Sequence, residues 1–266
     1  MLTIGFVCPT YKANELHAYT ERAITSFFET TPNGVVILAD DASPDWGKYE
    51  LKLEELGSKL NISKDRFRVI RFDRVGKLTR SWNSGLRLAA HLKLDYAIAG
   101  NNDVIFTPRW YSGLLHALDN GYEMVGPLSN APGVTAKGIQ EIKHYTDKYK
   151  LSDSPEVLKS IADDIYDRHL GKVFESPVNG FFQMAKMRSW IAGMYDTNNF
   201  YRPVNKFTSK GKPNRTPLMT LNEDELQGRW RKKGMLSAVV CSSYIFHYRA
   251  VSRGPKHKKG DAFRIK

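Results

Sequence analysis

The sequence contains no apolar run long enough to span a bilayer, which takes about 20 such residues. Its first residues, MLTIGFVCPTYK, place no basic leader before the apolar stretch, so we expect a first strand there rather than a signal peptide. Cysteine is scarce: Cys8 and Cys241 are the only two, and both lie in apolar runs typical of buried positions. This usage favours a reducing compartment, and we expect a cytoplasmic protein.

Internal repeats and low-complexity segments are also absent from the 266 residues. The chain is 41% hydrophobic, which is enough to bury the core of one compact unit. We therefore expect a single domain over residues 1–248, followed by a basic C-terminal tail over residues 249–266.

Positive charge is plentiful and is concentrated in two stretches. The formal net charge is +12. Residues 202–215, RPVNKFTSKGKPNR, carry five Lys or Arg and no acid, and residues 249–266 carry seven against one Asp. Such clustering favours a polyanionic partner or a ligand that carries phosphate. The alternative is a solvated surface loop followed by a frayed terminus.

Strand and helix patterns alternate in the first half of the chain. Short apolar runs predict strands at 3–8, 35–39, 67–72, 96–100 and 123–126. Segments with helical periodicity lie between them, at 15–29, 46–60, 78–92 and 108–118. Such an order predicts an α/β fold with a mostly parallel central sheet and helices on both faces.

The pattern changes after residue 132. A polar, helix-rich stretch over residues 140–170 predicts a helical insertion. PVNGFFQMAK (177–186) predicts a strand, NEDELQGRWRKKG (222–234) a helix with acids at its start and bases at its end, and LSAVVCSSYIFHY (236–248) a last strand.

Polar residues follow several of the predicted strands. Successive parallel strands end at one edge of a sheet, where open α/β sheets bind ligands, so these residues are candidates for one crevice. They lie in four loops, which are Pro9, Thr10 and Tyr11; Asp40, Asp41, Ala42 and Ser43; Asn101, Asn102 and Asp103; and the turn from Pro127 to Asn130. The alternative for each is an ordinary polar turn.

Several of these residues have a specific chemistry to offer. A carboxylate at Asp40 or Asp41 can accept the imide hydrogen of a nucleobase, although capping of a helix is the alternative use. The stretch KLTRSWN at 77–83 starts a helix, whose end can face an anion beside Arg80 and Asn83. The alternative there is that Thr79 caps the helix and Arg80 is solvated.

Two further groups suggest catalysis. Asp103 can hold a hard cation such as Mg²⁺ or Mn²⁺ against a diphosphate, with His247 as a second contact across the crevice. Glu223 and Asp224 begin a helix, where the helix dipole favours acids, and either can serve as a general base.

Taken in order, these stretches resemble the inverting glycosyltransferases of the GT-A fold, family 2. VCPTYK resembles the first-strand signature, ILADDASPD the base-binding loop and NNDVIFTPRW the strand-end motif whose last Asp meets the metal and the sugar diphosphate. LTRSWNSGL, GPLSN, VNGFFQMAK, NEDELQGRWRKKG and YIFHYRAVS match later segments of that family. The resemblance extends over almost the whole chain.

The resemblance implies a GT-A-type fold with an acceptor-side helical insertion and a metal-assisted, in-line sugar transfer. Residues 1–130 would bind the nucleotide sugar, expected to be a UDP-sugar, and residues 131–248 would form the acceptor half. The cofactor would be Mn²⁺ or Mg²⁺ on Asp103 and His247. The implied donor-binding residues are Pro9, Thr10, Tyr11, Asp40, Asp41, Arg80, Asn83, Asn101, Asn102 and Asp103.

The chain departs from the family pattern at two places. The usual Asp-x-Asp is Asn101-Asn102-Asp103 here, so one carboxylate is missing. The position of the base is also ambiguous: a direct match of the Glu-Asp pair gives Asp224, which we favour, whereas counting back from Arg229 gives Glu223.

The acceptor is indicated by charge alone. The basic stretches flank the candidate base and His247 in sequence, which favours a hydroxymethylated base in DNA as acceptor. A cell-surface polysaccharide or lipid-linked acceptor is the alternative. A nucleotidyltransferase would show a Gly-rich loop after the first strand, unlike CPTYKANE, and a non-catalytic nucleic-acid-binding protein would not need the ordered acidic loops.

Overall fold

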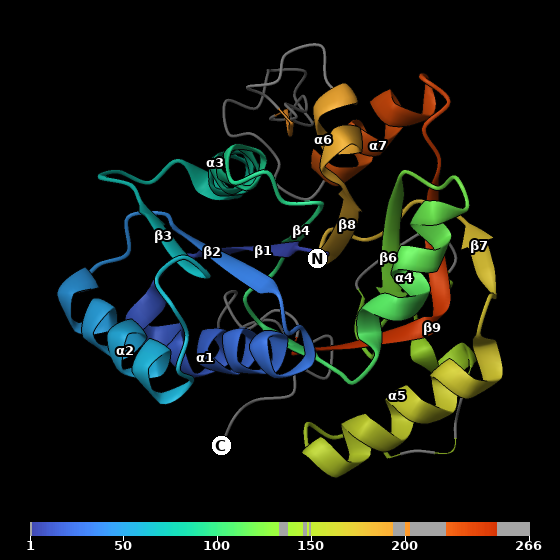
Figure 1. Cartoon of the computed structure of the whole chain (residues 1–266), viewed down its shortest axis with the longest axis horizontal. Coiled ribbons are helices and arrows are strands. Elements are labelled where there is room, and N and C mark those ends of the chain that lie inside the picture. Colours follow the sequence, from blue (N-terminus) through green and yellow to red (C-terminus); the bar gives the residue numbers. More distant parts are fainter. Residues whose placement is uncertain are drawn as a thin grey trace, which may run out of the picture.

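The computed structural model of the chain describes residues 2–132, 138–145, 148, 150–193, 200–202 and 222–248. These residues form a central sheet with helices on both faces (Figure 1). The strands are β1 Ile4–Thr10, β2 Gly34–Asp40, β3 Phe67–Arg71, β4 Tyr96–Gly100, β5 Val104–Phe106, β6 Met124–Leu128, β7 Val173–Glu175, β8 Phe182–Lys186 and β9 Ser237–His247. The helices are α1 Ala13–Thr30, α2 Trp46–Lys59, α3 Lys77–His91, α4 Trp110–Asp119, α5 Pro155–His169, α6 Met187–Ala192 and α7 Asn222–Arg231.

The strand order is β3-β2-β1-β4-β8-β6-β9-β5, and β7 pairs with β9. The first four strands are parallel, as the alternation of strands and helices predicts. Strand β8 is antiparallel to both of its neighbours, and β5 and β7 are antiparallel to β9, so the sheet is mixed in its second half. The predicted α/β fold with a central sheet is confirmed.

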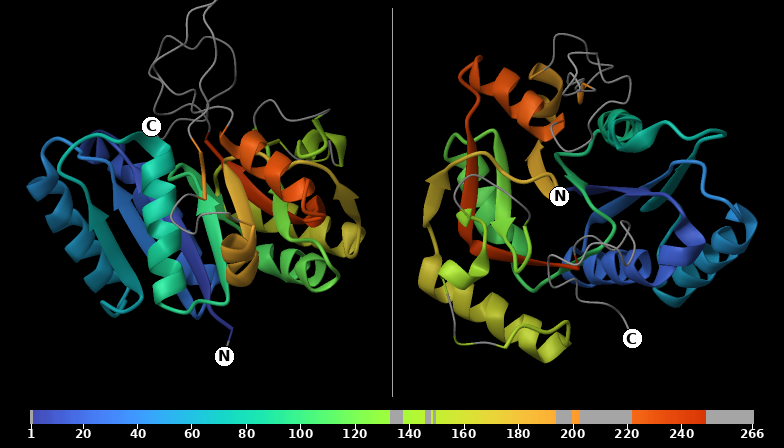
Figure 2. Two further views of the ribbon diagram at one scale, coloured as in Figure 1. Left: turned by 90° about the horizontal axis from the view of Figure 1, so that it is seen from above. Right: turned by 180° about the vertical axis from the view of Figure 1, so that it is seen from behind.

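Each face of the sheet has its own core. Val7 and Ile37 point to one face, where Trp82 and Leu86 of α3 cover them. Phe6 and its neighbours on β2 point to the other face, under α1, α2 and α4. Figures 1 and 2 show α3, α6 and α7 on one side of the sheet and α1 and α2 on the other. Burial on both faces explains why these strands read as continuous apolar runs.

The predicted helical insertion is α5. Its start follows from the sequence, because the Ser154 hydroxyl accepts a hydrogen bond from Val157 N–H and Pro155 occupies the first turn. The buried residues Leu158, Ile161 and Ile165 join the core of the α3 face. The helix packs against β9 and thereby covers the strand that ends at His247.

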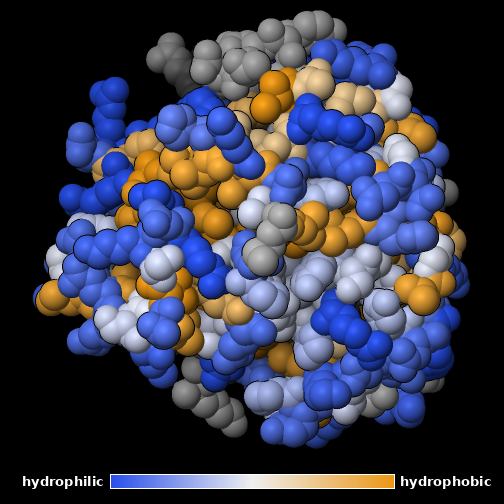
Figure 3. Space-filling model, in the orientation of Figure 1, coloured by the Kyte–Doolittle hydropathy of each residue, from blue (hydrophilic) through white to orange (hydrophobic). Residues whose placement is uncertain are grey.

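The surface agrees with the composition. In the described ranges, no helix is both long and apolar enough to cross a membrane. Hydrophilic side chains cover most of the face shown in Figure 3. Cys8 and Cys241 are buried and free, as predicted.

Candidate active site

The predicted polar residues gather at the edge where the parallel strands end. Thr10 pairs with Asp40 in the ladder between β1 and β2, and Asn101 directly follows β4. Antiparallel β8 begins at the same edge, since Asn101 N–H donates to the Phe181 carbonyl over 2.9 Å. The edge is therefore built by both halves of the chain.

Asp103 and His247 form the most suggestive pair at this edge. His247 Nε2 lies 3.1 Å from Asp103 Oδ1, and both side chains are at least nine-tenths buried. His247 Nδ1 lies 2.7 Å from the Ala131 carbonyl, which can only accept, so Nδ1 carries the hydrogen. In the neutral ring, Nε2 then presents its lone pair towards Asp103.

That arrangement fits a divalent cation. Asp103 Oδ1 is buried and accepts no hydrogen bond from any described residue. In the neutral tautomer, the imidazole nitrogen and the carboxylate oxygen face each other without a hydrogen between them, which suits a positive ion held by both. Mg²⁺ and Mn²⁺ take few protein ligands when phosphates and water complete the shell. Asp103 and His247 could thus supply the two protein ligands of such an ion.

The two amides beside Asp103 behave differently. Asn101 Nδ2 lies 3.4 Å from His247 Nε2 and donates to it when the ring hydrogen is on Nδ1, so the Asn101 side chain stays beside that ring. Asn102 Nδ2 donates to Thr20 Oγ1 of α1 over 3.0 Å, which turns that amide towards the helix. Contacts of either amide with a nucleotide sugar remain a prediction.

The loop after β2 is folded back on itself. Asp40 Oδ2 accepts the Ser43 N–H over 2.9 Å, and its other oxygen is bonded to the Ser43 hydroxyl. Ala42 makes the tight turn possible with a φ of 60°, in the left-handed region. Burial raises the pKa of Asp40 above its usual value, against the lowering effect of the Ser43 hydrogen bonds.

Asp41 caps helix α3. Its carboxylate accepts the N–H groups of Gly76 and Lys77 over 2.9 and 2.7 Å, and it pairs with Arg80 over 2.6 Å. The anion that faces the start of α3 is therefore this side chain, which agrees with the capping alternative for Asp41. The Arg80 guanidinium also lies 3.9 Å from the centre of the Phe72 ring. Their contact with a donor remains a prediction.

Removal of the Asp41 carboxylate should therefore affect folding. We expect Asp41→Ala to lower the free energy of unfolding by about 3 kcal/mol, because it strands a half-buried guanidinium and two helix-end N–H groups. Urea denaturation of both proteins would measure the loss. A variant of wild-type stability with weakened donor binding would instead assign Asp41 to the nucleotide.

Asn83 is likewise engaged within the protein. Its side chain exchanges two hydrogen bonds with the main chain of Tyr201, over 2.8 and 3.1 Å. The Tyr201 hydroxyl in turn donates to Gln183 of β8. Asn83 thus fastens residues 200–202 to α3.

The remaining residues of the first loop offer little chemistry. Pro9 is buried within β1, and Tyr11 is 45% exposed. Thr10 is buried, and its hydroxyl has no hydrogen-bond partner among the described residues. A ligand that reaches the end of β1 could satisfy this hydroxyl.

Glu223 and Asp224 face different surroundings. A Cβ atom added at Gly180 would lie 2.6 Å from Glu223 Oε1, so the carboxylate lies directly against this glycine. Glu223 Oε2 is buried without a hydrogen-bond partner in the described part of the chain. Asp224 is exposed and lines a shallow pocket with Glu175 and Arg231.

Burial sets the protonation of Glu223. It raises the pKa of this carboxyl from 4.5 to about 7, and the neighbouring charge of Asp224 contributes in the same direction. A carboxyl with this pKa is available both as a base and as an acid near neutral pH.

The same shift predicts a pH-dependent stability. The folded-state pKa of Glu223 is raised, so wild-type stability falls as pH rises from about 4.5 to about 7. We expect Glu223→Gln to exceed the wild type by about 1–3 kcal/mol in free energy of unfolding at pH 8. The two proteins should converge towards pH 4.5. Urea denaturation at both pH values tests this, and an equal difference at both would contradict it.

Two contacts connect Glu223 to Asp103 and His247, the pair of residues that could bind a cation. The Phe181 ring stacks on the His247 imidazole, with centroids 5.0 Å apart and planes 16° apart. Gly180, the preceding residue, lies against Glu223. Helix α7 is further tied to the start of α3 by a 2.6 Å bond from Asn222 Nδ2 to Thr79 Oγ1, and Figure 2 shows both helices on one side of the sheet.

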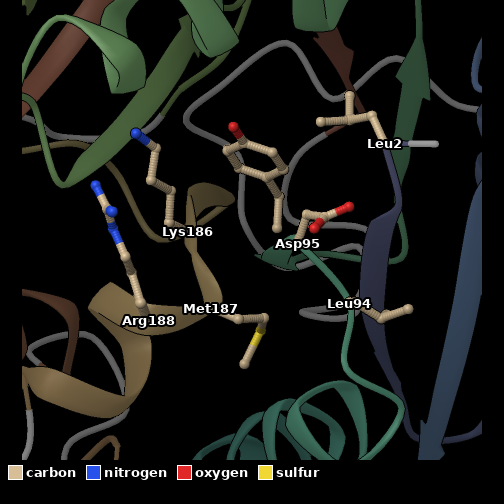
Figure 4. Close-up of a pocket in the computed structure, with 7 residues that line it drawn as sticks. Leu2, Leu94, Asp95, Lys186, Met187 and Arg188 are labelled. Atoms are coloured by element: carbon tan, nitrogen blue, oxygen red, sulfur yellow. The ribbon is translucent and has the colours of Figure 1, made fainter.

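A second hollow lies at the opposite edge of the sheet. Its volume is about 630 Å³, and its lining includes Asp95, Lys186 and Arg188 (Figure 4). Asp95 accepts hydrogen bonds from Thr3, and Lys186 is bonded to the Leu118 carbonyl and paired with Asp119. Because the charges of Asp95 and Lys186 are already engaged, the hollow is a weaker candidate for chemistry.

The sequence did not predict the roles of three site residues, although Asn130 lies in the candidate turn at 127–130. Asn130 binds the main chain of His247, Phe181 stacks on its ring, and Gly180 makes room for Glu223. The GPLSN and VNGFF segments were noted for their order along the chain, but no local pattern distinguishes these residues. The basic stretches lie outside the described residues, apart from Arg202.

The family comparison decides what this site belongs to. The model of the family described as "Glycosyl transferase family 2" matches residues 6–202, about three quarters of the chain. The chain belongs to glycosyl transferase family 2. Within this family 2 chain, Asp103 lies inside the matched range, whereas Glu223 and His247 lie beyond it. No curated protein matches the sequence.

Solved structures support the fold of this family 2 protein. A crystal structure of GalNAc-T7 with UDP, GalNAc and Mn²⁺ aligns with a TM-score of 0.60 and 16% identity, over 93% of this chain and 44% of that one. TarS 1–349 of S. aureus aligns with a TM-score of 0.51 and 14% identity, over 93% of this chain and 60% of that one. The chain therefore spans about half the length of these proteins. The predicted GT-A-type fold is confirmed.

Proposed function

We propose that this chain is an inverting glycosyltransferase that moves a sugar from a nucleotide-diphosphate sugar to an acceptor hydroxyl. The observation that carries the proposal is the pair of adjacent residues Gly180 and Phe181. Gly180 lies against the candidate base Glu223, and Phe181 stacks on His247, which with Asp103 could bind the cation. His247 and Glu223 are therefore linked through two neighbouring residues, and we infer that the sugar of a diphosphate held at His247 lies on the side of Glu223.

The donor side of the proposal rests on Asp103 and His247. When bound there, Mn²⁺ or Mg²⁺ would neutralise the diphosphate as it departs. A UDP-sugar is the expected donor, which is supported by the similar fold of the GalNAc-T7 structure with UDP and Mn²⁺. Residues 1–130 would form the nucleotide-sugar half, as the sequence predicts.

We assign the base to Glu223. Its carboxylate is the buried one of the two candidates, it lies against Gly180 next to Phe181, and its pKa of about 7 suits proton transfer at neutral pH. Asp224, which the direct match of the Glu-Asp pair favours, lies on the exposed face of α7 instead. A difference of one residue on a helix rotates a side chain by about 100°, which separates the two environments.

The reaction would be a single in-line displacement. Glu223 accepts the proton of the acceptor hydroxyl while the oxygen of that hydroxyl forms a bond to the anomeric carbon. The bond from that carbon to the diphosphate oxygen breaks on the opposite face, and the nucleoside diphosphate leaves with the electron pair. One displacement inverts the anomeric configuration.

For the acceptor we propose a hydroxymethylated base in DNA. The support is the charge of +12 and its location in the sequence, before the helix of Glu223 and after His247. Residues 131–248 would form the acceptor half, and residues 249–266 a tail that contacts phosphates. A base would have to leave the duplex to reach a crevice of this kind.

The test is nucleotide release from a panel of nucleotide sugars with Mn²⁺ or Mg²⁺, with and without hydroxymethylcytosine-containing DNA. Unmodified DNA of the same sequence is the control. We expect release from one UDP-sugar that depends on the modified DNA. Slow release that does not depend on DNA would support a glycosyltransferase but contradict DNA as the acceptor, and would favour a glycan or a lipid-linked sugar. Absence of release from every donor, with every acceptor tried, would contradict the proposal.

A further inference from the structure

The turn after β6 makes three hydrogen bonds to His247, the last residue of β9. Asn130 Oδ1 accepts the His247 N–H over 2.8 Å, and Asn130 Nδ2 donates to the His247 carbonyl over 3.0 Å. The next residue in the turn, Ala131, offers its carbonyl to His247 Nδ1 over 2.7 Å. One turn therefore fixes both the main chain and the ring of this histidine.

The side chain of Asn130 continues a ladder that the strands do not. Strands β6 and β9 are parallel neighbours (Figure 1), but their register shifts after Pro127, and their last pair is Leu128 with Tyr244. His247 lies three residues further on. A side-chain amide has the donor and the acceptor of a peptide group, so Asn130 can serve both main-chain groups of His247 in place of a strand.

The ring bond determines which nitrogen faces Asp103. With the hydrogen held on Nδ1 by the Ala131 carbonyl, Nε2 of the neutral ring has a lone pair for a ligand. The Phe181 stack fixes the plane of the ring but does not distinguish its two nitrogens. The tautomer is therefore set from the turn and not from the stack.

We propose that Asn130 is a positioning residue for the cation site, which holds His247 so that Nε2 is directed at the ion beside Asp103. This inference rests on the proposed function for the identity of the site. Asn130 touches neither ion nor donor in this role, and it acts through His247 alone. Loss of its amide frees the main chain of His247 and thereby its ring bond to Ala131.

The first measurement is the tautomer of His247 in the metal-free protein, from the ring nitrogen shifts in an ¹⁵N spectrum assigned with His247→Gln. We expect the wild type to hold its hydrogen on Nδ1, and Asn130→Ala to show a mixture of both tautomers. An unchanged spectrum in folded Asn130→Ala would overturn the proposal. If the alanine variant does not fold, Asn130→Asp is the substitute, because it keeps the oxygen that accepts the His247 N–H and removes the amide that donates to the His247 carbonyl. The same spectrum should then show a mixture of tautomers, and an unchanged spectrum would overturn the proposal.

The second measurement is the affinity for Mn²⁺ alone, from the electron paramagnetic resonance signal of the free ion. Loss of a residue that orients a metal ligand weakens binding by about 10- to 100-fold, which is the expected result for Asn130→Ala. Asn120→Ala is the matched control, because Asn120 also bonds a histidine, His116, but on α4 and away from the site. Its Mn²⁺ affinity should equal that of the wild type.

The two measurements test the proposed cation site and the positioning role of Asn130 separately. A wild type that binds no Mn²⁺ would contradict the proposed cation site, while the tautomer spectrum would still decide the role of Asn130. A wild type that binds Mn²⁺ and an Asn130→Ala variant that binds it equally well would overturn the positioning role and leave the proposed function standing.

Discussion

The variant Glu223→Gln is expected to transfer sugar about 10²- to 10⁴-fold more slowly than the wild type, the range for loss of a general base. Glutamine has the shape of the glutamate and fits the same space against Gly180, but it cannot accept the proton. Initial rates at saturating donor and acceptor would measure the change. Donor affinity should be unaltered, because the residue acts on the acceptor.

The matched control is the neighbouring carboxylate. Asp224→Asn removes an exposed charge from the same helix and should keep the transfer rate within a few-fold of the wild type. In the wild type, kcat/KM should fall as pH drops below about 7, where Glu223 becomes protonated. The opposite pattern, with Asp224→Asn inactive and Glu223→Gln active, would return the base to Asp224.

The second large effect is expected at Asp103. Asp103→Asn keeps the size of the side chain but removes the charge of a buried oxygen that has no hydrogen-bond partner among the described residues. We expect Mn²⁺-dependent binding of UDP to weaken by more than about 100-fold, since loss of a ligand should exceed the effect of a residue that only orients one. Calorimetry with UDP, with and without Mn²⁺, measures this.

A carboxylate at the other edge of the sheet provides the control for Asp103. Within the described part of the chain, the Asp95 side chain is hydrogen-bonded to Thr3, so Mn²⁺-dependent binding of UDP should not change in Asp95→Asn. If Asp103→Asn binds UDP with the metal dependence of the wild type, Asp103 is not a ligand of the ion. The proposed role of His247 as the second ligand would then be rejected as well.

The elements of the donor half could be predicted from the sequence because both faces of its sheet are covered. The run at 96–100 matches β4 residue for residue, and the strands predicted at 3–8, 35–39, 67–72 and 123–126 begin and end within two residues of β1, β2, β3 and β6. The short strand β5 was not predicted. The direction of β8 was not predictable. An apolar strand has the same pattern in either direction, and its antiparallel pairing with β4 is set by contacts distant in sequence.

Within the site, the sequence identified the types of residue but not their directions. Asp41 and Asp40 follow the same strand, yet one caps α3 and the other bonds to Ser43. Both uses depend on where the start of α3 lies in space. The turn that contains Asn130 was a candidate, but the role of Asn130 was not predicted, because an asparagine in a turn has an ordinary local explanation. Its bonds to His247 span 117 positions and leave no local signal.

The position of strand β9 has a consequence for how this protein folds during synthesis. It is the last described strand to leave the ribosome, yet it lies inside the sheet, between β6 and β5, and ends at His247. Until residues 237–247 emerge, β6 and β5 present unpaired edges to the surrounding solution, as incomplete sheets do during synthesis. A nascent chain without β9 therefore lacks part of the candidate active site, and its dependence on chaperones should be greatest just before translation reaches β9.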